Sequence, residues 1–399
     1  MNIRDIVKKG LTPQNKQKLQ SVILNTERIL CGRKKVETTF WWEAIGEASN
    51  NCFFGYYDVS PFNSKGEVLY LKLDKELREA DIMLYNRNSN QHKLLSTSRA
   101  WNWQQGSRLR WFPKTDDTIV FNDCMEGRYI ARKINTSSQE EEIYNSPLYD
   151  IDCNGKLGLS LDFGRLGIKR PGYGYTCFPY REPDDLDNEG IDLVNLIDNT
   201  SKRIVTYSDI AETIKINNEN FSNNYINHLS FSPSGNKFMF FWLTIVGSYH
   251  KAFMLVYDMQ TRSIIPLETE WKVSHYLWLD DDRLLCTVYD EKDECSYVIY
   301  GLDGSKRHVF KSINFDGHPI WYKGGLILTD SYPINKGYQQ LLKCNLETDK
   351  VEKILEVFHE PAISIERRTD LHPRYDEATD TICIDACPKG KRNLYLIKE

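Results

Sequence analysis

The feature that most constrains this chain is a short phrase that recurs seven times: a polar or aromatic residue, then a strand, then a tight turn. In the four C-terminal copies a histidine stands at the same point of the phrase, and these histidines are His228, His275, His318 and His372. In the three N-terminal copies the same point is occupied by Tyr56, Arg108 and Leu148. Most copies are about 40 to 50 residues apart, and a strand-rich repeat of that length is typical of propeller blades.

The pattern between the phrases predicts four short strands per repeat. Residues 237–265 contain apolar and aromatic runs that are separated by Asp, Gly and Ser, which are turn residues. The last repeat ends after three such runs, at 393–397, whereas another run at 38–42 precedes the first complete repeat. We therefore expect an all-β fold, a seven-bladed β-propeller with WD40- or TolB-like blades, in which the N-terminal run completes blade seven.

Two segments lie outside the repeat. Thr12 and Pro13 precede a pattern of apolar residues that predicts an N-capped amphipathic helix. The apolar positions of that helix are Leu19, Val22, Ile23, Ile29 and Leu30. We expect residues 1–37 to form a helical extension packed on the propeller of residues 38–399, with binding to a partner or membrane surface as the alternative. The long interval around 163–225 is expected to be an insertion between blades three and four.

Composition excludes several classes of protein. Lys and Arg total 51 against 56 Asp and Glu, so the chain lacks the basic surface of a nucleic-acid-binding protein. No apolar run is long enough to be a transmembrane segment, and residues 1–5 lack the apolar core of a secretory signal. Ten scattered cysteines without a Cys-x-x-Cys pair predict reduced thiols and a cytoplasmic protein. The sequence leaves the oligomeric state open.

The histidine register predicts a metal site. Equivalent residues at the start of the innermost strands form a ring at one mouth of the propeller channel, so four imidazoles would converge there. Asp316 precedes His318 by two residues and Asp370 precedes His372 by two, which places each pair on one face of a strand. Such groups suit a divalent transition metal. The candidate ligands are His275, His318, His372 and the amide of Gln104. The alternative is that each histidine only hydrogen-bonds between blades.

A second set of residues has the chemistry that an acidic sugar requires, because aromatic rings stack on sugar faces and arginine binds carboxylate through two N–H groups. The candidates are Tyr56, Trp103, Gln105, Arg128, Arg170, Tyr173 and Arg368. Segment 170–175 has the sequence Arg-Pro-Gly-Tyr-Gly-Tyr, and its glycines suggest a lid with mobile joints. For each candidate a structural role is the alternative: core packing for the rings, an ion pair for Arg128 and a cap on blades three and four for the segment.

Several phrases resemble known propellers. Segments 54–58, 99–106, 170–175, 317–319 and 370–373 resemble a group of propellers encoded among bacterial surface-polysaccharide genes. The architecture and histidine placement also resemble the oligogalacturonate lyase family. That resemblance implies a manganese ion held by three histidines and one glutamine, with a Gln-x-x-His-x-His group in the last blade. Here Asp370 stands where the first of the two close histidines would be, and no glutamine lies three residues before it.

The reaction that this resemblance implies is β-elimination on a uronate, with an acidic oligosaccharide or polysaccharide as the partner. His228 would act as the base, and Asp370 is the second catalytic candidate. A glycoside hydrolase is an alternative, because Asp58, Asp123, Asp316 and Asp370 could provide a pair of catalytic carboxylates. A non-catalytic glycan-binding or assembly factor is a third reading, because a propeller fold does not fix function.

Overall fold

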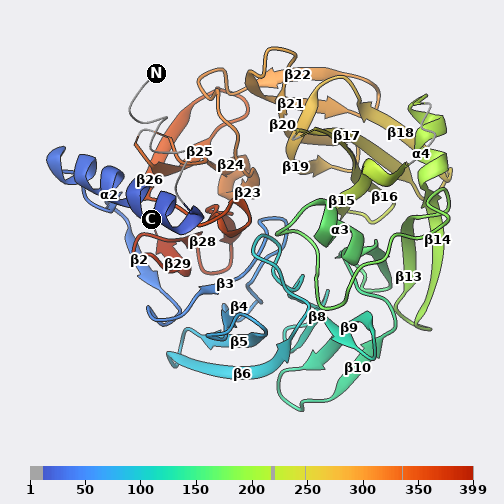
Figure 1. Ribbon diagram of the computed structural model, residues 1–399, viewed down its shortest axis with the longest axis horizontal. Helices are drawn as coiled ribbons and strands as arrows, with labels where there is room; N and C mark the ends of the chain where they lie inside the picture. The colour runs from blue at the N-terminus through green and yellow to red at the C-terminus, as the bar shows by residue number, and fades with distance from the viewer. Residues whose placement is uncertain (1–11, 217–220, 248, 335, 399) are drawn as a thin grey trace.

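Seven antiparallel sheets surround a central channel in the computed structural model, which describes residues 12–216, 221–247, 249–334 and 336–398 (Figure 1). Each sheet is one blade, and in blades one to five its first strand in the chain lies at the channel, whereas in blades six and seven an N-terminal strand lies at the outer edge. The predicted seven-bladed propeller is therefore confirmed. Residues 1–5, on which the expectation about a secretory signal rests, lie outside the described residues.

The first three blades come from the N-terminal half of the chain. Blade one contains β3 (Cys52–Phe53), β4 (Val68–Leu73), β5 (Ala80–Asn86) and β6 (Gln91–Ser98). Blade two contains β7 (Arg110–Trp111), β8 (Thr118–Met125), β9 (Arg128–Asn135) and β10 (Glu141–Tyr144). Blade three contains β11 (Asp150–Ile151), β12 (Leu157–Ser160), β13 (Gly190–Asn195) and β14 (Thr200–Thr206).

The other four blades carry the histidine phrases. Blade four contains β15 (Asn224–Phe231), β16 (Lys237–Val246), β17 (Tyr249–Asp258) and β18 (Ser263–Glu268). Blade five contains β19 (Lys272–Asp280), β20 (Arg283–Tyr289), β21 (Cys295–Gly301) and β22 (Lys306–Val309). Blade six contains β23 (Ile320–Tyr322), β24 (Leu326–Asp330), β25 (Tyr338–Cys344), β26 (Val351–Phe358) and β1 (Val36–Thr38). Blade seven contains β27 (Arg374–Asp376), β28 (Thr381–Ala386), β29 (Asn393–Lys398) and β2 (Trp41–Ala44).

Blade seven closes the ring with strands from the two ends of the propeller. β2 pairs antiparallel with β29, and Trp41 lies opposite Lys398. The ring of Trp42 stacks on Tyr395 with centroids 4.4 Å apart. This arrangement confirms the predicted closure, because it covers an edge of β29 that would otherwise be open. The sequence did not indicate β1, which adds a fifth strand at the outer edge of blade six.

Hydrophobic burial explains why the blades stack. The run from Phe238 to Trp242 in β16 is buried at every position, although a strand facing one core would alternate between buried and exposed residues. Both faces of such a middle strand are covered because each blade packs on the blades at either side.

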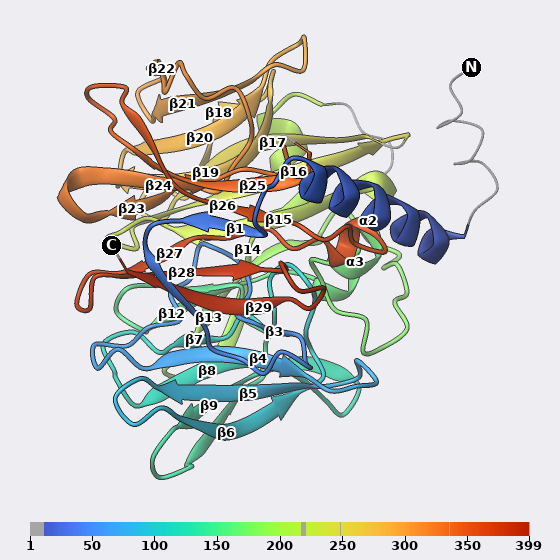
Figure 2. The same ribbon diagram turned by 90° about the vertical axis from the view of Figure 1, so that its left-hand side faces the viewer.

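Helix α2 (Pro13–Leu30) begins as predicted, because the Thr12 side chain accepts a hydrogen bond from the backbone N–H of Asn15. The helix lies on the same side of the ring as α3 (Phe163–Lys169) (Figure 2). Its contact with the propeller is mainly polar: Gln17 donates to the carbonyl of Pro361, and Ser21 donates to Glu360.

Helix α2 contacts the propeller as expected, but it does so mainly through its polar side. The apolar positions that predicted this helix are all exposed, and they are Leu19, Val22, Ile23, Ile29 and Leu30. The polar residues on the other side of the helix form hydrogen bonds with the propeller loop around Glu360, and these bonds determine which face of the helix turns inward. Among the described helices none is long and apolar enough to cross a membrane.

The long segment expected between blades three and four lies mostly inside blade three. Its first part joins β12 to β13 and contains α3 and residues 170–189, and the following strands β13 and β14 belong to the blade itself. A second short helix, α4 (Tyr207–Thr213), follows β14 and leads to η1 (Phe221–Asn223). Residues 217–220 of the expected insertion lie outside the described residues.

Segment 170–177, which we call the lid segment, is held tightly. The backbone N–H of Tyr175 donates to the carbonyl of Phe163, and a Cβ on Gly174 would lie only 2.1 Å from the nitrogen of Gly167. Gly174 is therefore required for close packing on α3, which corrects the expectation that it serves as a mobile joint. Cys177 forms a disulfide with Cys124 in β8, so the expectation that every cysteine is reduced is also wrong. Their separation of 53 residues gave no signal in the sequence.

Candidate functional site

The four repeat histidines converge inside the channel. The ring centroids of His275 and His318 are 3.9 Å apart, and those of His318 and His372 are 4.4 Å apart. Tyr56 touches all four rings, and its centroid lies 5.1 Å from that of His228. The histidines are at most 6% exposed, so they form a buried layer within the channel instead of an open ring at its mouth. We call these five residues the histidine layer.

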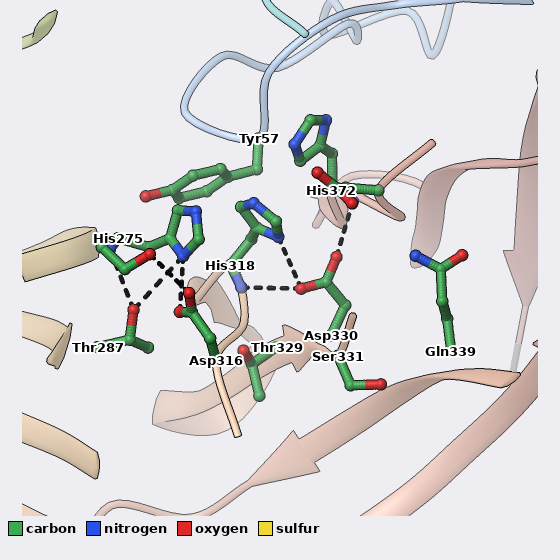
Figure 3. Close-up of polar contacts among 12 residues, drawn as sticks. Tyr57, His275, Thr287, Asp316, His318, Thr329, Asp330, Ser331, Gln339 and His372 are labelled. Carbon is green, nitrogen blue, oxygen red and sulfur yellow. Dashed lines mark hydrogen bonds and ion pairs between the residues drawn. The ribbon is translucent and has the colours of Figure 1, made fainter. Parts of the chain in front are cut away.

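Three of the histidines are oriented through Nδ1. The Nδ1 of His275 lies 2.9 Å from Asp316, and the Nδ1 of His318 lies 2.8 Å from Asp330 (Figure 3). The Nδ1 of His372 lies 2.9 Å from the carbonyl oxygen of Gly55. An Nδ1–H that donates to a carboxylate or carbonyl leaves Nε2 as the nitrogen with a free lone pair, which is the usual arrangement of metal-binding histidines.

Asp330 holds two blades together at this point. One carboxylate oxygen accepts from the backbone N–H of His318, and the other accepts from the backbone N–H of His372 (Figure 3). The residue ends β24 and is 1% exposed. The sequence analysis missed Asp330, because it lies 12 residues after His318 on the next strand and belongs to no repeated phrase. In the sequence, the position of Asp330 at the end of the second strand of its blade was the only sign of this role.

Charge and burial set the protonation of the layer. Burial lowers the pKa of His275 more than Asp316 raises it, and burial lowers the pKa of His372 well below its usual range. Burial would also lower the pKa of His318, but the Asp330 carboxylate outweighs burial and raises that pKa. Burial would raise the pKa of Asp316, but His275 outweighs it, so the carboxyl is ionised. Burial therefore favours the neutral imidazole, the form that binds cations, at His275 and His372, whereas the carboxylates around His318 favour its protonated form.

His228 differs from the other three because aromatic rings surround it. Its centroid lies 6.0 Å from Tyr173 and 5.1 Å from Phe241. Its Nδ1 is buried and has no hydrogen-bond partner among the described residues. Burial first, and then the charges of neighbouring groups such as Arg108, place its pKa well below the usual value. His228 is therefore a neutral imidazole with a ring nitrogen that no other group uses.

Above the histidine layer, on the side of the lid segment, lie two arginines that were predicted to bind substrate. Arg170 stacks over the ring of Tyr173 at 5.2 Å, and Tyr173 in turn contacts His228 and Tyr56. No carboxylate of the described part of the chain forms an ion pair with Arg170, and Tyr173 is its side-chain hydrogen-bond partner. The sequence analysis also missed Tyr332, whose ring lies 5.9 Å from His318 on this side.

Arg368 and Asp370 form a pair in the same region. Arg368 donates to both carboxylate oxygens of Asp370, over 2.6 and 2.7 Å, and its guanidinium lies 4.4 Å from the Tyr332 ring. Burial would raise the pKa of Asp370, but Arg368 outweighs it and the pKa is lowered. Asp370, the second catalytic candidate, is therefore an ionised and paired carboxylate, which suits a ligand or an electrostatic partner.

Below the histidine layer, side chains fill the channel. We call the group of Tyr57, Asp58 and Arg108 the plug. The hydroxyl of Tyr57 crosses the channel, donating to the carbonyl of Tyr276 over 2.8 Å and accepting from the N–H of the same residue. Arg108 donates to both oxygens of Asp58, and its Nε donates to the carbonyl of Tyr149. Arg108 stands where later blades carry histidine, so the same repeat position serves the plug in blade two and the layer in blades four to seven.

The structure does not bring all predicted residues together. Trp103 lies outside the channel, where it stacks on Phe53 and receives Arg367 over its ring. Arg128 is exposed at the start of β9, the third strand from the channel, and so it does not wall a channel site. Its place beside the β8–β9 turn follows from the strand order, which the sequence spacing alone did not resolve.

Gln104 and Gln105 differ in their hydrogen-bond partners. Gln104 donates through Nε2 to the carbonyls of Glu366 and Arg368, so its side chain is bonded to the segment before blade seven and not to the histidine rings. Gln105 donates to Tyr149 and to Asn227, which adjoins His228. In both residues Oε1 is buried and without a partner in the described chain. Gln105 is therefore the amide that lies nearer the layer by its contacts.

The layer passes a test for a metal site. One ligand atom from each of His318, Asp370 and His372 lies within 4.8 Å of the others, and all three residues are buried. The Nε2 of His372 is buried without a hydrogen-bond partner in the described residues, which is costly unless a further group binds there. The donors are imidazole nitrogens and a carboxylate, so they fit a divalent transition metal. His275 lies beside this group through its contact with His318.

Comparisons with known proteins agree on the fold. A solved oligogalacturonate lyase in complex with manganese has a TM-score of 0.66 and 13% sequence identity, covering 92% of this chain and 96% of that chain. An oligogalacturonate lyase from Vibrio parahaemolyticus has a TM-score of 0.65 and 11% identity, covering 91% and 97%. The β-propeller domain of the Trilobed protease from Pyrococcus furiosus has a TM-score of 0.50 and 8% identity, covering 87% and 93%.

Sequence comparisons find no relatives. No protein-family model matches the chain, and no curated protein matches it. At the low identities of the structural matches, the likeness establishes the seven-bladed propeller fold and nothing finer.

Proposed function

We propose that this protein is a carbohydrate-active enzyme that cleaves a uronate-containing oligosaccharide or polysaccharide by metal-assisted β-elimination at the histidine layer. The observation that carries the proposal is the orientation of His275, His318 and His372, each held through Nδ1 while the rings meet. Structural likeness to a lyase that was solved with manganese supports the same chemistry.

The ion would be held by His275, His318 and His372, with Asp370 beside them. We expect manganese or a similar divalent cation, which when bound would neutralise the substrate carboxylate and so acidify the neighbouring C–H. Gln104, the fourth predicted ligand, faces other partners, and the Asp370 carboxylate is the oxygen donor found close to the histidines. Asp316 and Asp330 keep the imidazoles in the tautomer that binds a cation.

The remaining residues supply binding and proton transfer. Arg170 has a guanidinium without a carboxylate partner and binds the uronate carboxylate. His228 takes the proton from the carbon next to that carboxylate, through its unused ring nitrogen. The electron pair of the C–H bond forms a double bond as the glycosidic oxygen leaves the neighbouring carbon. Tyr56, whose hydroxyl is buried without a partner in the described chain, gives that oxygen a proton.

The hydrolase alternative receives less support from the contacts of its carboxylates. Asp58 is bound by Arg108, Asp123 by Arg132, Asp316 by His275, and Asp370 by Arg368. Paired carboxylates have lowered proton affinity, whereas a hydrolase needs one carboxyl that stays protonated. A glycan-binding or assembly role would use the same arginines and rings without the base. The origin among surface-polysaccharide genes stays a prediction.

Metal content and product analysis test the proposal together. Protein purified without a histidine tag should retain a divalent metal, and uronate oligosaccharides should yield unsaturated products that absorb in the ultraviolet. His318→Gln keeps an amide donor for Asp330 but removes the imidazole ligand, so it should lose both the metal and the product. His308→Gln, an exposed histidine on β22, is the matched control and should keep both.

The two readouts separate the alternatives. A protein that retains no metal and yields no unsaturated sugar, yet binds uronate oligosaccharides, would be a binding or assembly factor. Saturated products released by the wild-type protein would indicate hydrolysis.

A further inference from the structure

A groove on the outside of the lid segment lies next to the histidine layer but is separate from it. The groove has a volume of about 450 Å³, and Trp101, Trp103, Arg78, Arg99 and Arg367 are among the residues that line it. Pro171, Gly172 and Gly174 form its inner wall. We call it the Trp–Arg groove.

The lid segment is the wall between the groove and the channel. Its residues alternate in direction: the backbone of Gly172 faces the groove, whereas Arg170 and Tyr173 face the channel, where Tyr173 contacts His228. The N–H of Gln104 donates to the carbonyl of Gly172, and Asn102 donates to the carbonyl of Tyr173. A chain molecule that lies in the groove therefore runs along the outer side of the segment whose inner side meets the histidine layer.

The groove is cationic on a chain that is anionic overall. Three guanidinium groups and one carboxylate, Glu366, line it, although the whole chain has a net charge of −5. Arg78 is paired with the exposed Glu76. No carboxylate of the described residues forms an ion pair with Arg99 or Arg367. The guanidinium of Arg99 donates to the carbonyl of Cys124, and its backbone N–H donates to Asp123. Unpaired guanidinium groups in a hollow favour an anionic ligand.

Two tryptophans complete the chemistry. The indole rings of Trp101 and Trp103 meet edge to face with centroids 5.4 Å apart, and both side chains are half-buried. The Nε1–H of Trp101 donates to the carbonyl of Arg78, which fixes that ring in the groove. The guanidinium of Arg367 lies 5.4 Å from the ring of Trp103. A fixed aromatic face beside a guanidinium can stack on a sugar ring while the cation binds the carboxylate of the same sugar.

We propose that the Trp–Arg groove is a second binding site for acidic saccharides, which holds uronate units of a chain whose next units reach the histidine layer. The inference rests on the proposed function for the identity of the chain, and it adds where the distant sugars bind. It predicts that affinity increases with chain length, because only a longer chain occupies both sites.

Calorimetric titration with two galacturonate oligosaccharides tests this inference on the full-length protein. Arg367→Ala should weaken binding of a hexasaccharide about tenfold, the effect expected when one charge-assisted contact is lost, and should leave binding of a disaccharide unchanged. Arg307→Ala removes a similarly exposed arginine from β22 and should change neither. Trp103→Leu should weaken the hexasaccharide in the same way, and the melting temperature of each variant shows that it is folded.

A methyl-esterified hexasaccharide separates charge from stacking. It should bind more weakly than the acid form to the wild-type protein, and Arg367→Ala should not weaken it further. Unchanged binding of the acidic hexasaccharide to Arg367→Ala would overturn the inference. Equal weakening for disaccharide and hexasaccharide would also overturn it, because Arg367 would then belong to the site at the histidines.

Failure of this inference is distinguishable from failure of the proposed function. Unsaturated products from wild-type protein, with hexasaccharide binding insensitive to Arg367, would leave the elimination intact and remove the groove. The reverse result, a length-dependent loss in Arg367→Ala without unsaturated products, would leave the groove as a saccharide site and remove the elimination.

Discussion

The two ends of the channel differ in how completely their polar groups are paired. In the plug below the histidine layer, Tyr57 bonds both backbone groups of Tyr276, and Arg108 and Asp58 satisfy each other through two hydrogen bonds. In and above the layer, His228, His372 and Tyr56 each have a buried polar atom without a partner in the described chain. Arg108 of the plug stands at the same repeat position as the four histidines of the layer.

This difference indicates which residues serve stability and which serve function. Buried polar atoms are nearly always hydrogen-bonded in folded proteins, and a cluster of exceptions needs an explanation. None of the three residues of the plug has a buried side-chain N or O atom without a hydrogen-bond partner. The paired charges of the plug therefore contribute to the stability of the fold. In the histidine layer the buried polar atoms without a partner lie together, and Arg170 nearby has no carboxylate partner among the described residues. This arrangement is expected where a ligand supplies the missing hydrogen bonds.

The largest effect is expected in the plug. Arg108→Ala leaves the buried Asp58 carboxylate without its partner, and the free energy of unfolding should decrease by about 3 to 5 kcal/mol. Denaturant unfolding followed by fluorescence measures the change. Arg128→Ala, at an exposed position, should stay within about 0.5 kcal/mol of the wild type. Equal effects of the two substitutions would show that the pairing in the plug contributes nothing special.

The stability of the fold is expected to depend on pH through His359, which lies near Thr369 and Asp370 on the side of the lid segment. Burial lowers its pKa to about 4, against a usual value of about 6.5, and its Nε2 accepts from the N–H of Thr369. Because the unfolded chain binds the proton more readily, this histidine favours the fold above about pH 6.5, and the benefit is lost as pH falls towards 4. Between pH 7 and 5 the loss amounts to about 2 kcal/mol.

His359→Gln tests that contribution, because the amide oxygen can accept from Thr369 without titrating. Unfolding curves at several pH values should show a smaller loss of stability in acid for the variant than for the wild type. Parallel losses in the two proteins would assign the acid sensitivity to other groups.

A smaller effect, without loss of stability, is expected at Arg170. Arg170→Lys keeps the positive charge but removes the two-point contact with a carboxylate, so binding of uronate oligosaccharides should weaken about tenfold, equivalent to about 1.4 kcal/mol. The melting temperature should change little, because no carboxylate of the described chain pairs with this residue. A collapse in melting temperature with unchanged affinity would move Arg170 from the site to the scaffold.

The smallest effect on stability is expected for Tyr56→Phe. The hydroxyl that is removed has no partner in the described chain, so the free energy of unfolding should change by less than about 0.5 kcal/mol. Metal retention should persist, whereas release of unsaturated sugar should fall. Tyr57→Phe is the matched change in the plug, where two hydrogen bonds are lost, and it should destabilise the protein more. The opposite order would contradict the division between the two ends.

Much of the fold could be predicted because the repeat is local. The spacing of the phrases gave the number of blades, and the three-strand remainder at 393–397 together with 38–42 gave the closure between β29 and β2. The convergence of His228, His275, His318 and His372 followed from their shared register. Each of these predictions needs only the position of a residue within its own blade.

The parts that could not be predicted depend on contacts between blades. Asp330 accepts from the backbone N–H of His372 in blade seven, Cys177 meets Cys124 across 53 residues, and Gln104 turns towards Arg368. Trp103 was expected at the histidines because it adjoins Gln104 and Gln105 in sequence. In the structure the lid segment separates Trp103 from the histidines. Side-chain direction at the end of a strand is set by neighbouring blades, and sequence spacing does not contain that information.

The closure of blade seven has a consequence for the order of folding. β2 is synthesised before any complete blade, but its partner β29 is synthesised after all the others. Blade seven therefore cannot be completed until the whole chain is available, and pairing over such a sequence separation is slow because of the entropy lost on closing the loop. His372 leads this last blade, so the histidine layer is assembled only when the ring closes.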